Sequence, residues 1–304
     1  MWPSPFSRKQ TVNLVLTVLE IVAPVFLLAG VGFTWVKLGF EYRIEFITRL
    51  AMTLSVPALI FTALMKTEIE PHALTTLTLA SLVAYGGVTL ATFILIRLGR
   101  LEARTYLAPL IFGNTGNLGL PLALFAFGEE GLGFAVVVFA VMGILSFTFG
   151  VWLVSGGGSI LKVLKEPLVG ATLLGALFLW QGWETPRFLT NTLDLIGQLA
   201  IPMMLLTLGV AMARLHPARL GRAVWLAAAK VAICMAIGWG VGTWFALPPI
   251  AFAVLVVQIT TPVAVTSYML AEKYGADADA VAGLVVVSTL MSVGTIPLTL
   301  ALVI

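Results

Sequence analysis

Charged residues are scarce in this chain, which has only 14 Asp and Glu and 17 Lys and Arg among its 304 residues. They make up 10% of the chain, against roughly 25% in soluble globular domains, while 60% of the residues are hydrophobic. This composition excludes a soluble fold. Long polar stretches are missing as well, so no soluble domain fits between the apolar segments and the membrane portion must carry the function.

Three further absences narrow the class of protein. The single cysteine, Cys234, lies inside an apolar segment and cannot form an intrachain disulfide. The basic residues behind the net charge of +3 stand singly in the connections, which argues against a nucleic-acid partner. There is no HExxH, no GxSxG and no pair of aspartates inside an apolar segment. We therefore expect no enzyme activity, no cofactor and no bound metal ion.

What the chain has in abundance is apolar runs of about 20 residues, the length of a helix that crosses a hydrocarbon core. Separated by short polar connections, these runs predict an all-α integral membrane protein with ten transmembrane helices and membrane lipid as its surroundings. The first run is too long, and too interrupted by Glu20 and Pro24, for a cleaved signal peptide, so we expect it to stay. The predicted spans are 13–36, 46–65, 73–96, 105–127, 132–154, 164–181, 188–213, 222–246, 250–271 and 280–303.

Positive charge predicts how these spans are oriented, because Lys and Arg concentrate in cytoplasmic connections. Twelve Lys and Arg residues fall in the connections on one side of the ten spans and four on the other, with Lys230 inside a span. Arg8 and Lys9 in the N-terminal tail favour the opposite orientation weakly. The global count predicts a multi-pass protein of the plasma or inner membrane with both termini outside.

The two halves of the chain repeat each other. Leu54-Ser-Val-Pro57 in the second span matches Leu199-Ala-Ile-Pro202 in the seventh, 145 residues later. The polar stretch 113–121 in the fourth span corresponds at nearly equal spacing to 258–267 in the ninth. Each copy holds an odd number of spans, so the second copy must be inverted relative to the first, as in many secondary transporters. Repeat 1 covers about 11–155 and repeat 2 about 160–304 of a single transporter unit.

The fourth and ninth spans are predicted to be broken helices. Gly113-Asn-Thr-Gly-Asn-Leu-Gly-Leu-Pro121 holds three glycines, two asparagines and a proline at a depth where lipid demands a satisfied backbone. In the ninth span Pro262 is flanked by Gln258, Thr260 and Thr261. Helix halves that meet near the midplane aim their positive N-termini at one point, which favours an anion there.

Two asparagines are the sharpest candidates for ligand binding. Asn114 and Asn117 lie three residues apart in the fourth span, and buried amides in a bilayer are costly unless they have partners. For Asn114 a ligand role is favoured over a helix–helix contact, whereas for Asn117 both remain open. Pro57 and Pro202 are equally consistent with a kink and with lining a pocket. The predicted substrate site comprises Asn114, Gly116, Asn117, Gly119, Pro121, Gln258, Thr260, Thr261, Pro262, Pro57 and Pro202.

These residues resemble the auxin efflux carrier family, which includes the plant PIN proteins and bacterial carriers for small carboxylates such as malate and malonate. The resemblance covers essentially the whole chain. Its strongest pieces are Asn114-Thr-x-x-x-Gly119-x-Pro121 and the run from Gln258 and Pro262 to Ala271-Glu-Lys-Tyr274, supported by Leu208-Gly209 and the stretch 288–298. One departure is that the long hydrophilic loop of many plant members is absent, which favours a bacterial-type carrier.

The resemblance implies an architecture and a mechanism. Spans four and nine would be crossing, broken helices. Spans one, two, six and seven would form a scaffold that dimerises with a second copy, while spans three to five and eight to ten would form a mobile transport part that moves like an elevator. The family's substrate-binding asparagine in span four corresponds to Asn114. A small carboxylate is the substrate that this implies.

Three charges inside spans are candidates for coupling or substrate attraction: Glu20, Asp194 and Lys230. Each has an alternative, since Glu20 and Asp194 lie toward span ends and Lys230 can extend its flexible stem toward the interface. No carboxylate falls in either polar break, which favours uniport or proton-linked transport of an anion. The alternative is a sodium-coupled organic anion symporter of the bile-acid symporter type. A channel is disfavoured because two isolated polar breaks do not predict a continuous pore.

Overall fold

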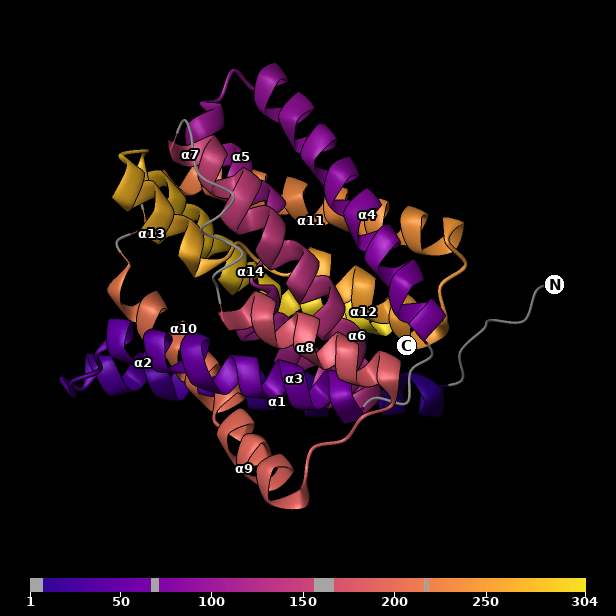
Figure 1. Ribbon diagram of the computed structural model, residues 1–304. Coiled ribbons are helices and arrows are strands. Elements are labelled where there is room, and N and C mark those ends of the chain that lie inside the picture. The colour runs from indigo at the N-terminus through magenta and orange to yellow at the C-terminus, as the bar shows by residue number, and fades with distance from the viewer. Residues whose placement is uncertain (1–7, 67–70, 156–166, 216, 218) are drawn as a thin grey trace.

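The computed structural model describes residues 8–66, 71–155, 167–215, 217 and 219–304, and in this part of the chain it is helical throughout (Figure 1). Three single π-helical turns are η1 (Ala51–Ser55), η2 (Thr115–Gly119) and η3 (Ser146–Gly150). The α-helices are α1 (Arg8–Lys37), α2 (Ile44–Leu50), α3 (Val56–Lys66), α4 (Pro71–Leu98), α5 (Ala103–Ile111), α6 (Leu120–Leu145), α7 (Val151–Ser155), α8 (Pro167–Gln181), α9 (Arg187–Gln198), α10 (Ala200–Arg214), α11 (Leu220–Trp244), α12 (Pro249–Thr260), α13 (Val265–Tyr274) and α14 (Ala278–Val303).

Seven helical stretches of the described residues are long and apolar enough to cross a membrane. Two shorter apolar helices, Gly170–Gln181 and Pro249–Thr260, accompany them. The chain is therefore an all-helical, multi-pass membrane protein, as its composition predicts. The seven stretches are Leu16–Lys37, Ile44–Lys66, His72–Leu98, Thr115–Ser155, Arg187–Arg214, Leu220–Trp244 and Ala278–Val303.

The difference between these seven stretches and the ten predicted spans has physical causes. The predicted span at 250–271 is divided into α12 and α13, and the predicted span at 105–127 is interrupted between α5 and η2. The start of the predicted span at 164–181 lies outside the described residues. The stretch Thr115–Ser155 contains a kink at Gly128, where φ is 66° and ψ is −155°. That conformation suits glycine, and it lies where the sequence predicts the connection between two spans.

Glycine allows α1 and α10 to pack backbone against backbone. A Cβ atom added at Gly209 would lie 1.7 Å from the carbonyl oxygen of Ala29, and one added at Gly32 would lie 2.1 Å from that of Leu206. Small residues permit close helix packing in a bilayer, where lipid is as apolar as the side chains and dispersion contacts drive association. α1 and α10 therefore form a tightly matched pair.

Helix packing and polar contacts divide the described helices into two groups. The first helix group consists of α1, α2, α3, α8, α9 and α10, where α1 packs on α10 and α3 packs on α8 and α9. The second helix group consists of α4, α5, α6, α7, α11, α12, α13 and α14, where α11 packs on α4, α12 and α14. In Figure 1 most of the first group lies in the lower part of the view and α4, α5, α11 and α13 lie above it.

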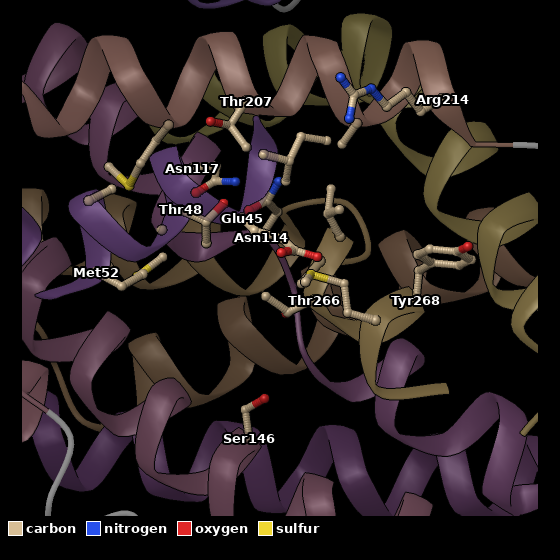
Figure 2. A pocket seen from close by; sticks show the side chains of 18 of the residues that line it. Glu45, Thr48, Met52, Asn114, Asn117, Ser146, Thr207, Arg214, Thr266 and Tyr268 are labelled. Carbon is tan, nitrogen blue, oxygen red and sulfur yellow. The ribbon is translucent and has the colours of Figure 1, made fainter. Parts of the chain in front are cut away.

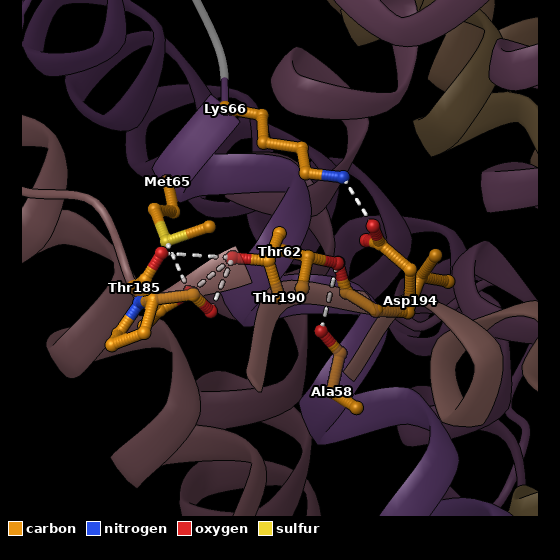
Figure 3. A network of polar contacts seen from close by, with 9 residues as sticks. Ala58, Thr62, Met65, Lys66, Thr185, Thr190 and Asp194 are labelled. Carbon is orange, nitrogen blue, oxygen red and sulfur yellow. Dashed lines mark hydrogen bonds and ion pairs between the residues drawn. The ribbon is translucent and has the colours of Figure 1, made fainter. Parts of the chain in front are cut away.

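Several side-chain polar contacts join distant elements of the same group. In the first group, Lys66 pairs with Asp194 at 2.5 Å, next to hydrogen bonds that join Thr185 to Thr190 and Met65 (Figure 3). In the second group, the Arg104 guanidinium donates to the carbonyls of Val154 and Tyr274. Arg219 in the same group pairs with Asp277 at 2.8 Å. Between the groups, α1 packs on α6 and α14, and α3 packs on α6.

Candidate functional site

The predicted break in the fourth span is present as an interrupted backbone. α5 stops at Ile111, and Phe112 is extended, with φ −93° and ψ 117°. The Asn114 N–H donates to the carbonyl oxygen of Pro262 at 2.7 Å instead of to a helical carbonyl. Gly113 pairs with Val263 in an isolated antiparallel bridge. Helix resumes at η2, and Asn114 is its N-cap residue.

The second break mirrors the first across this bridge. α12 ends at Thr260, and helix resumes in α13 at Val265. Pro262 has no N–H to continue a helix. The Thr261 hydroxyl donates to the carbonyl oxygen of Gln258 at 2.6 Å, and the Val263 N–H donates to the Ser288 hydroxyl at 3.0 Å. The Gln258 carbonyl is thus satisfied within the segment, whereas the Val263 N–H is satisfied by α14.

Two glycines let the broken segments approach each other. A Cβ atom at Gly113 would lie 2.2 Å from the Thr261 hydroxyl oxygen, and one at Gly119 would lie 2.1 Å from Oε1 of Gln258. Neither distance is compatible with a larger side chain unless the neighbour moves. The glycine content of the fourth span therefore serves close contact between the two breaks.

A cavity of about 800 Å³ lies beside the breaks, between the two helix groups (Figure 2). Its first wall comes from α2, η1 and α10 and includes Thr48, Met52 and Thr207. Its second wall comes from the two broken segments and from the end of α6 and η3, where Ser146 lies. Figure 2 shows Thr207 and Arg214 along one side, Ser146 on the opposite side, and Asn114 and Asn117 between them.

Two helix N-termini border this cavity. Asn114, Gly116 and Asn117 line it from the start of η2, and Ala264, Val265 and Thr266 line it from the start of α13. The first N–H groups of a helix have no intrahelical acceptor and carry the positive end of its dipole. The Nδ2 atom of Asn114, a residue only 5% exposed, has no hydrogen-bond partner among the described residues. The arrangement offers donors to an anion.

The rim of the cavity holds charged and aromatic residues. The Tyr42 and Thr207 hydroxyls are hydrogen-bonded at 2.8 Å, and the Arg214 guanidinium donates to the Tyr42 carbonyl at 2.5 Å. Burial raises the pKa of Tyr42 above its ordinary value, against the opposing effect of the hydrogen bond with Thr207, so its hydroxyl is neutral near pH 7. Arg43 pairs with Glu41 at 2.6 Å, and both side chains are exposed. These contacts hold the α1–α2 connection against α10.

The structure brings some of the predicted site residues together and leaves others apart. Asn114, Gly116 and Asn117 border the cavity. Pro57 is half-buried in α3, and Pro202 is exposed on α10. Neither proline belongs to the described lining. The remaining predicted residues are buried in or next to the breaks rather than on the cavity surface: Gly119, Pro121, Gln258, Thr260, Thr261 and Pro262.

The three candidate coupling charges also lie away from the cavity lining. Asp194 is paired with Lys66 at the end of α3 (Figure 3), and Glu20 is exposed on α1. Lys230 is 1% exposed in α11, and its amine donates to the carbonyl oxygen of Leu110 at 3.1 Å. Lys230 takes part in none of the ion pairs of the described residues.

Sequence reasoning missed most of the wall opposite the asparagines. Tyr42, Thr48, Ser146 and Thr207 border the cavity, yet none stands in a polar motif. A signal existed for Thr207, which is the only hydroxyl residue of α10. A polar side chain inside an apolar span is costly unless it has a partner, and the same argument supports Asn114. Within the described residues, no three His, Cys, Asp or Glu residues are grouped so as to hold a metal ion.

Comparison with known proteins decides the family. A family described as membrane transport protein matches residues 17–159 and 151–300, nearly the whole chain. The chain belongs to this family, the auxin efflux carriers. The family consists of transporters, so the protein is a membrane transporter and not an enzyme. The resemblance inferred from the span-four and span-nine motifs is confirmed.

Relatives within the auxin efflux carrier family are distant. An uncharacterized transporter of Methanothermobacter thermautotrophicus is 26% identical over 298 residues, which cover 92% of this chain and 96% of the relative. A Rhizobium meliloti protein named "Putative malonate transporter" is 25% identical over 267 residues, or 80% of this chain and 82% of the relative. An uncharacterized transporter of Methanocaldococcus jannaschii is 33% identical over 112 residues, covering 34% of this chain and 36% of the relative.

Proposed function

We propose that this protein carries small organic anions with a carboxylate group across the membrane, and that the anion binds in the cavity beside the two breaks. One observation carries the proposal: two helix N-termini and the unpaired amide of Asn114 border a single cavity. Helix N-termini favour negative charge, and amide N–H groups donate to carboxylate oxygens. The Asn117 amide supplies a second donor from the same helix end.

The malonate relative is consistent with this substrate class. Malonate is a small dicarboxylate, and a cavity of about 800 Å³ has room for it together with water. The cavity also holds apolar side chains such as Met52, Phe139 and Met142, which suit the carbon skeleton of an organic acid better than an inorganic ion.

We propose ten transmembrane helices in two inverted repeats, about 11–155 and 160–304, whose broken fourth and ninth spans cross. Support comes from the equivalent interruptions after Ile111 and Thr260 and from the bridge between Gly113 and Val263. α5, α12 and α13, with 9, 12 and 10 residues, are each too short to cross a bilayer alone, and the stretch that follows the first break turns at Gly128. When the two helices on either side of each break are counted as one span, the total agrees with the ten spans that the sequence predicts.

The mechanism that this arrangement favours is elevator-type alternating access. The first helix group corresponds to the scaffold of spans one, two, six and seven, and the second to the transport part. The polar side-chain contacts described above tie each group together internally. Between the groups α1 packs on α6 and α14, and buried residues of α1 such as Val22 and Val25 are apolar. An apolar contact without directional bonds can slide at little cost, because it does not have to break hydrogen bonds.

The distribution of positive charge supports an orientation of the protein in the membrane. Arg43, Arg214 and Glu272 line the cavity, at connections that the positive-inside rule assigns to the cytoplasm. This is an inward-facing arrangement, with both termini outside the cell.

The resemblance to the family implies a homodimer through the scaffold, whose helices α8 and α9 expose Leu173, Phe188 and Leu195 on their outer faces.

The coupling that we propose is uniport or proton-linked transport. A sodium-coupled symporter of the bile-acid type is the second candidate, and one observation favours it. Oε1 of Gln258 and Oγ1 of Thr115 are buried oxygens without a hydrogen-bond partner among the described residues. Unpaired buried oxygens suit a cation or a water molecule.

Uptake into proteoliposomes distinguishes uniport or proton-linked transport from sodium-coupled symport. Purified protein is tested with labelled malonate, with unlabelled mono- and dicarboxylates as competitors, in sodium and in potassium buffer and at two pH values. We expect saturable uptake that competing carboxylates inhibit and that does not require sodium. Uptake that requires sodium establishes the symporter. If no carboxylate binds or moves, the proposed substrate class is wrong.

A further inference from the structure

Lys230 is a buried lysine in α11 whose surroundings contain little to balance its charge. Its side chain is among the largest that are fully buried, with 1% exposure. The amine donates to the carbonyl oxygen of Leu110 at 3.1 Å and lies 4.0 Å from the Cys234 sulfur. A buried amine normally has a carboxylate partner. Lys230 has instead a backbone carbonyl, which needs its own explanation.

The break after α5 supplies that explanation. In a continuous helix the Leu110 carbonyl would accept the N–H of Asn114, four residues later. Here the Asn114 N–H donates to Pro262 at 2.7 Å, so the Leu110 carbonyl is left without its helical donor. Such a carbonyl also lies at the negative end of the α5 dipole, where a positive charge is favoured. The Lys230 amine occupies this position.

The second break satisfies its carbonyls in a different way. At the end of α12 the Gln258 carbonyl accepts the hydroxyl and the N–H of Thr261, from the same broken segment. The first break has Phe112 and Gly113 at the equivalent place, and neither side chain can donate a hydrogen bond. A donor must therefore come from another helix, and α11 packs against α5.

We propose that Lys230 is a positioning residue, which holds the broken end of α5 and thereby sets the place of Asn114 at the cavity. The segment 111–114 is held at both ends: the Lys230 amine binds the carbonyl before it, and Pro262 binds the N–H of Asn114. A fixed backbone here points the Asn114 amide into the cavity. The inference rests on the proposed function, because Asn114 is the proposed ligand of the carboxylate.

A double-mutant comparison tests this role. Malonate binding is measured on purified protein carrying Lys230→Met, Asn114→Ala or both changes. Methionine keeps the length and apolar stem of lysine but cannot donate. We expect Lys230→Met to weaken malonate binding about tenfold, the scale of one buried hydrogen bond. We expect it to have almost no further effect in the Asn114→Ala protein, since the amide it positions is then absent.

Amide hydrogen exchange supplies a readout that needs no ligand. Lys230→Met should speed exchange in 112–119 and leave α14 unchanged, whereas loss of general packing would raise it in both. Cys234→Ala is the matched control, because it removes the other neighbour of the same amine one helical turn away. It should leave binding and exchange at wild-type levels.

The outcomes distinguish this inference from the proposed function. Unchanged malonate binding in Asn114→Ala would show that the proposed substrate site is wrong. Weakened binding in Asn114→Ala alone, with Lys230→Met like wild type in binding and exchange, overturns only the role of Lys230. An undiminished effect of Lys230→Met in the Asn114→Ala protein overturns it too. Should the methionine variant not assemble, Lys230→Leu, which also lacks a donor, is held to the same two criteria.

Discussion

Asn114 links the two breaks and the cavity through its backbone N–H, its backbone carbonyl and its side chain. Its N–H bridges to Pro262 across the two breaks, its carbonyl accepts the N–H groups of Leu118 and Gly119, and its side chain borders the cavity. The side-chain amide alone lacks a partner among the described residues. An unpaired buried amide costs free energy unless a ligand or water completes it.

We therefore expect Asn114→Ala to weaken binding of malonate at least tenfold without lowering the melting temperature. The loss comes from one charge-assisted hydrogen bond, while the backbone contacts of residue 114 remain. Isothermal titration of purified protein measures the affinity, and a thermal melt checks the fold. Asn191→Ala on the exposed face of α9 is the control and should bind as wild type. Normal malonate affinity in Asn114→Ala would falsify the central assignment.

At the scale of the element, glycine allows α1 and α10 to pack closely. Gly209 of α10 lies against the backbone of α1, with Ala29 and Phe33 on the other side. Because the neighbouring atoms belong to the backbone, no side chain can rotate away to make room. The contact therefore depends on the missing Cβ atom, and with it the wall that α10 presents to the cavity.

Replacing this glycine should separate the two helices. Gly209→Ala is expected to lower stability by about 1–3 kcal/mol, the usual range for an overpacked contact. Gly294→Ala in α14 is the matched control, because nothing lies within 4 Å of the added Cβ atom. There alanine should be neutral or slightly stabilising, since it restricts the unfolded chain. Melting temperatures of the two variants in the same detergent make the comparison, and equal values would contradict the packing argument.

The broken elements illustrate what local sequence does and does not reveal. Gly113 and Pro262 indicate that regular helix does not run through these segments, because glycine lacks side-chain restraint and proline lacks a backbone donor. Pro121, which the sequence also assigns to the break, lies instead in the first turn of α6, a position that tolerates proline. The partners of the freed groups could not be read in the same way. Lys230 is 120 residues from Leu110, and Ser288 is 25 residues from Val263, so only packing brings each donor to its acceptor.

At the scale of the whole molecule, the proposed orientation predicts from which side of the membrane the cavity residues can be labelled. The native cysteine is unique and fully buried, so introduced cysteines report without interference. We expect a membrane-impermeant maleimide to label Glu184→Cys on intact cells and Glu45→Cys only after permeabilisation. Both positions are exposed glutamates, but only Glu45 borders the cavity. The opposite labelling pattern would invert the proposed topology.

The cavity walls give a second whole-molecule result from the same experiment. Thr266→Cys, at the start of α13, should react from the cytoplasmic side and be protected by malonate. Protection is expected because the ligand and the label occupy the same space. Labelling of Thr266→Cys that malonate leaves unchanged would place the substrate elsewhere.

The sequence alone determined that this is a helical membrane protein, where most helices begin and end, and that two segments interrupt their spans. These properties follow from local hydropathy and backbone chemistry, which the bilayer enforces residue by residue. Only the tertiary structure decided which groups surround the side chains of Asp194, Lys230 and Thr207. Whether a polar side chain forms an ion pair, binds a backbone carbonyl or lines a cavity depends on helices that are distant in sequence. Hydropathy does not indicate which helices pack together.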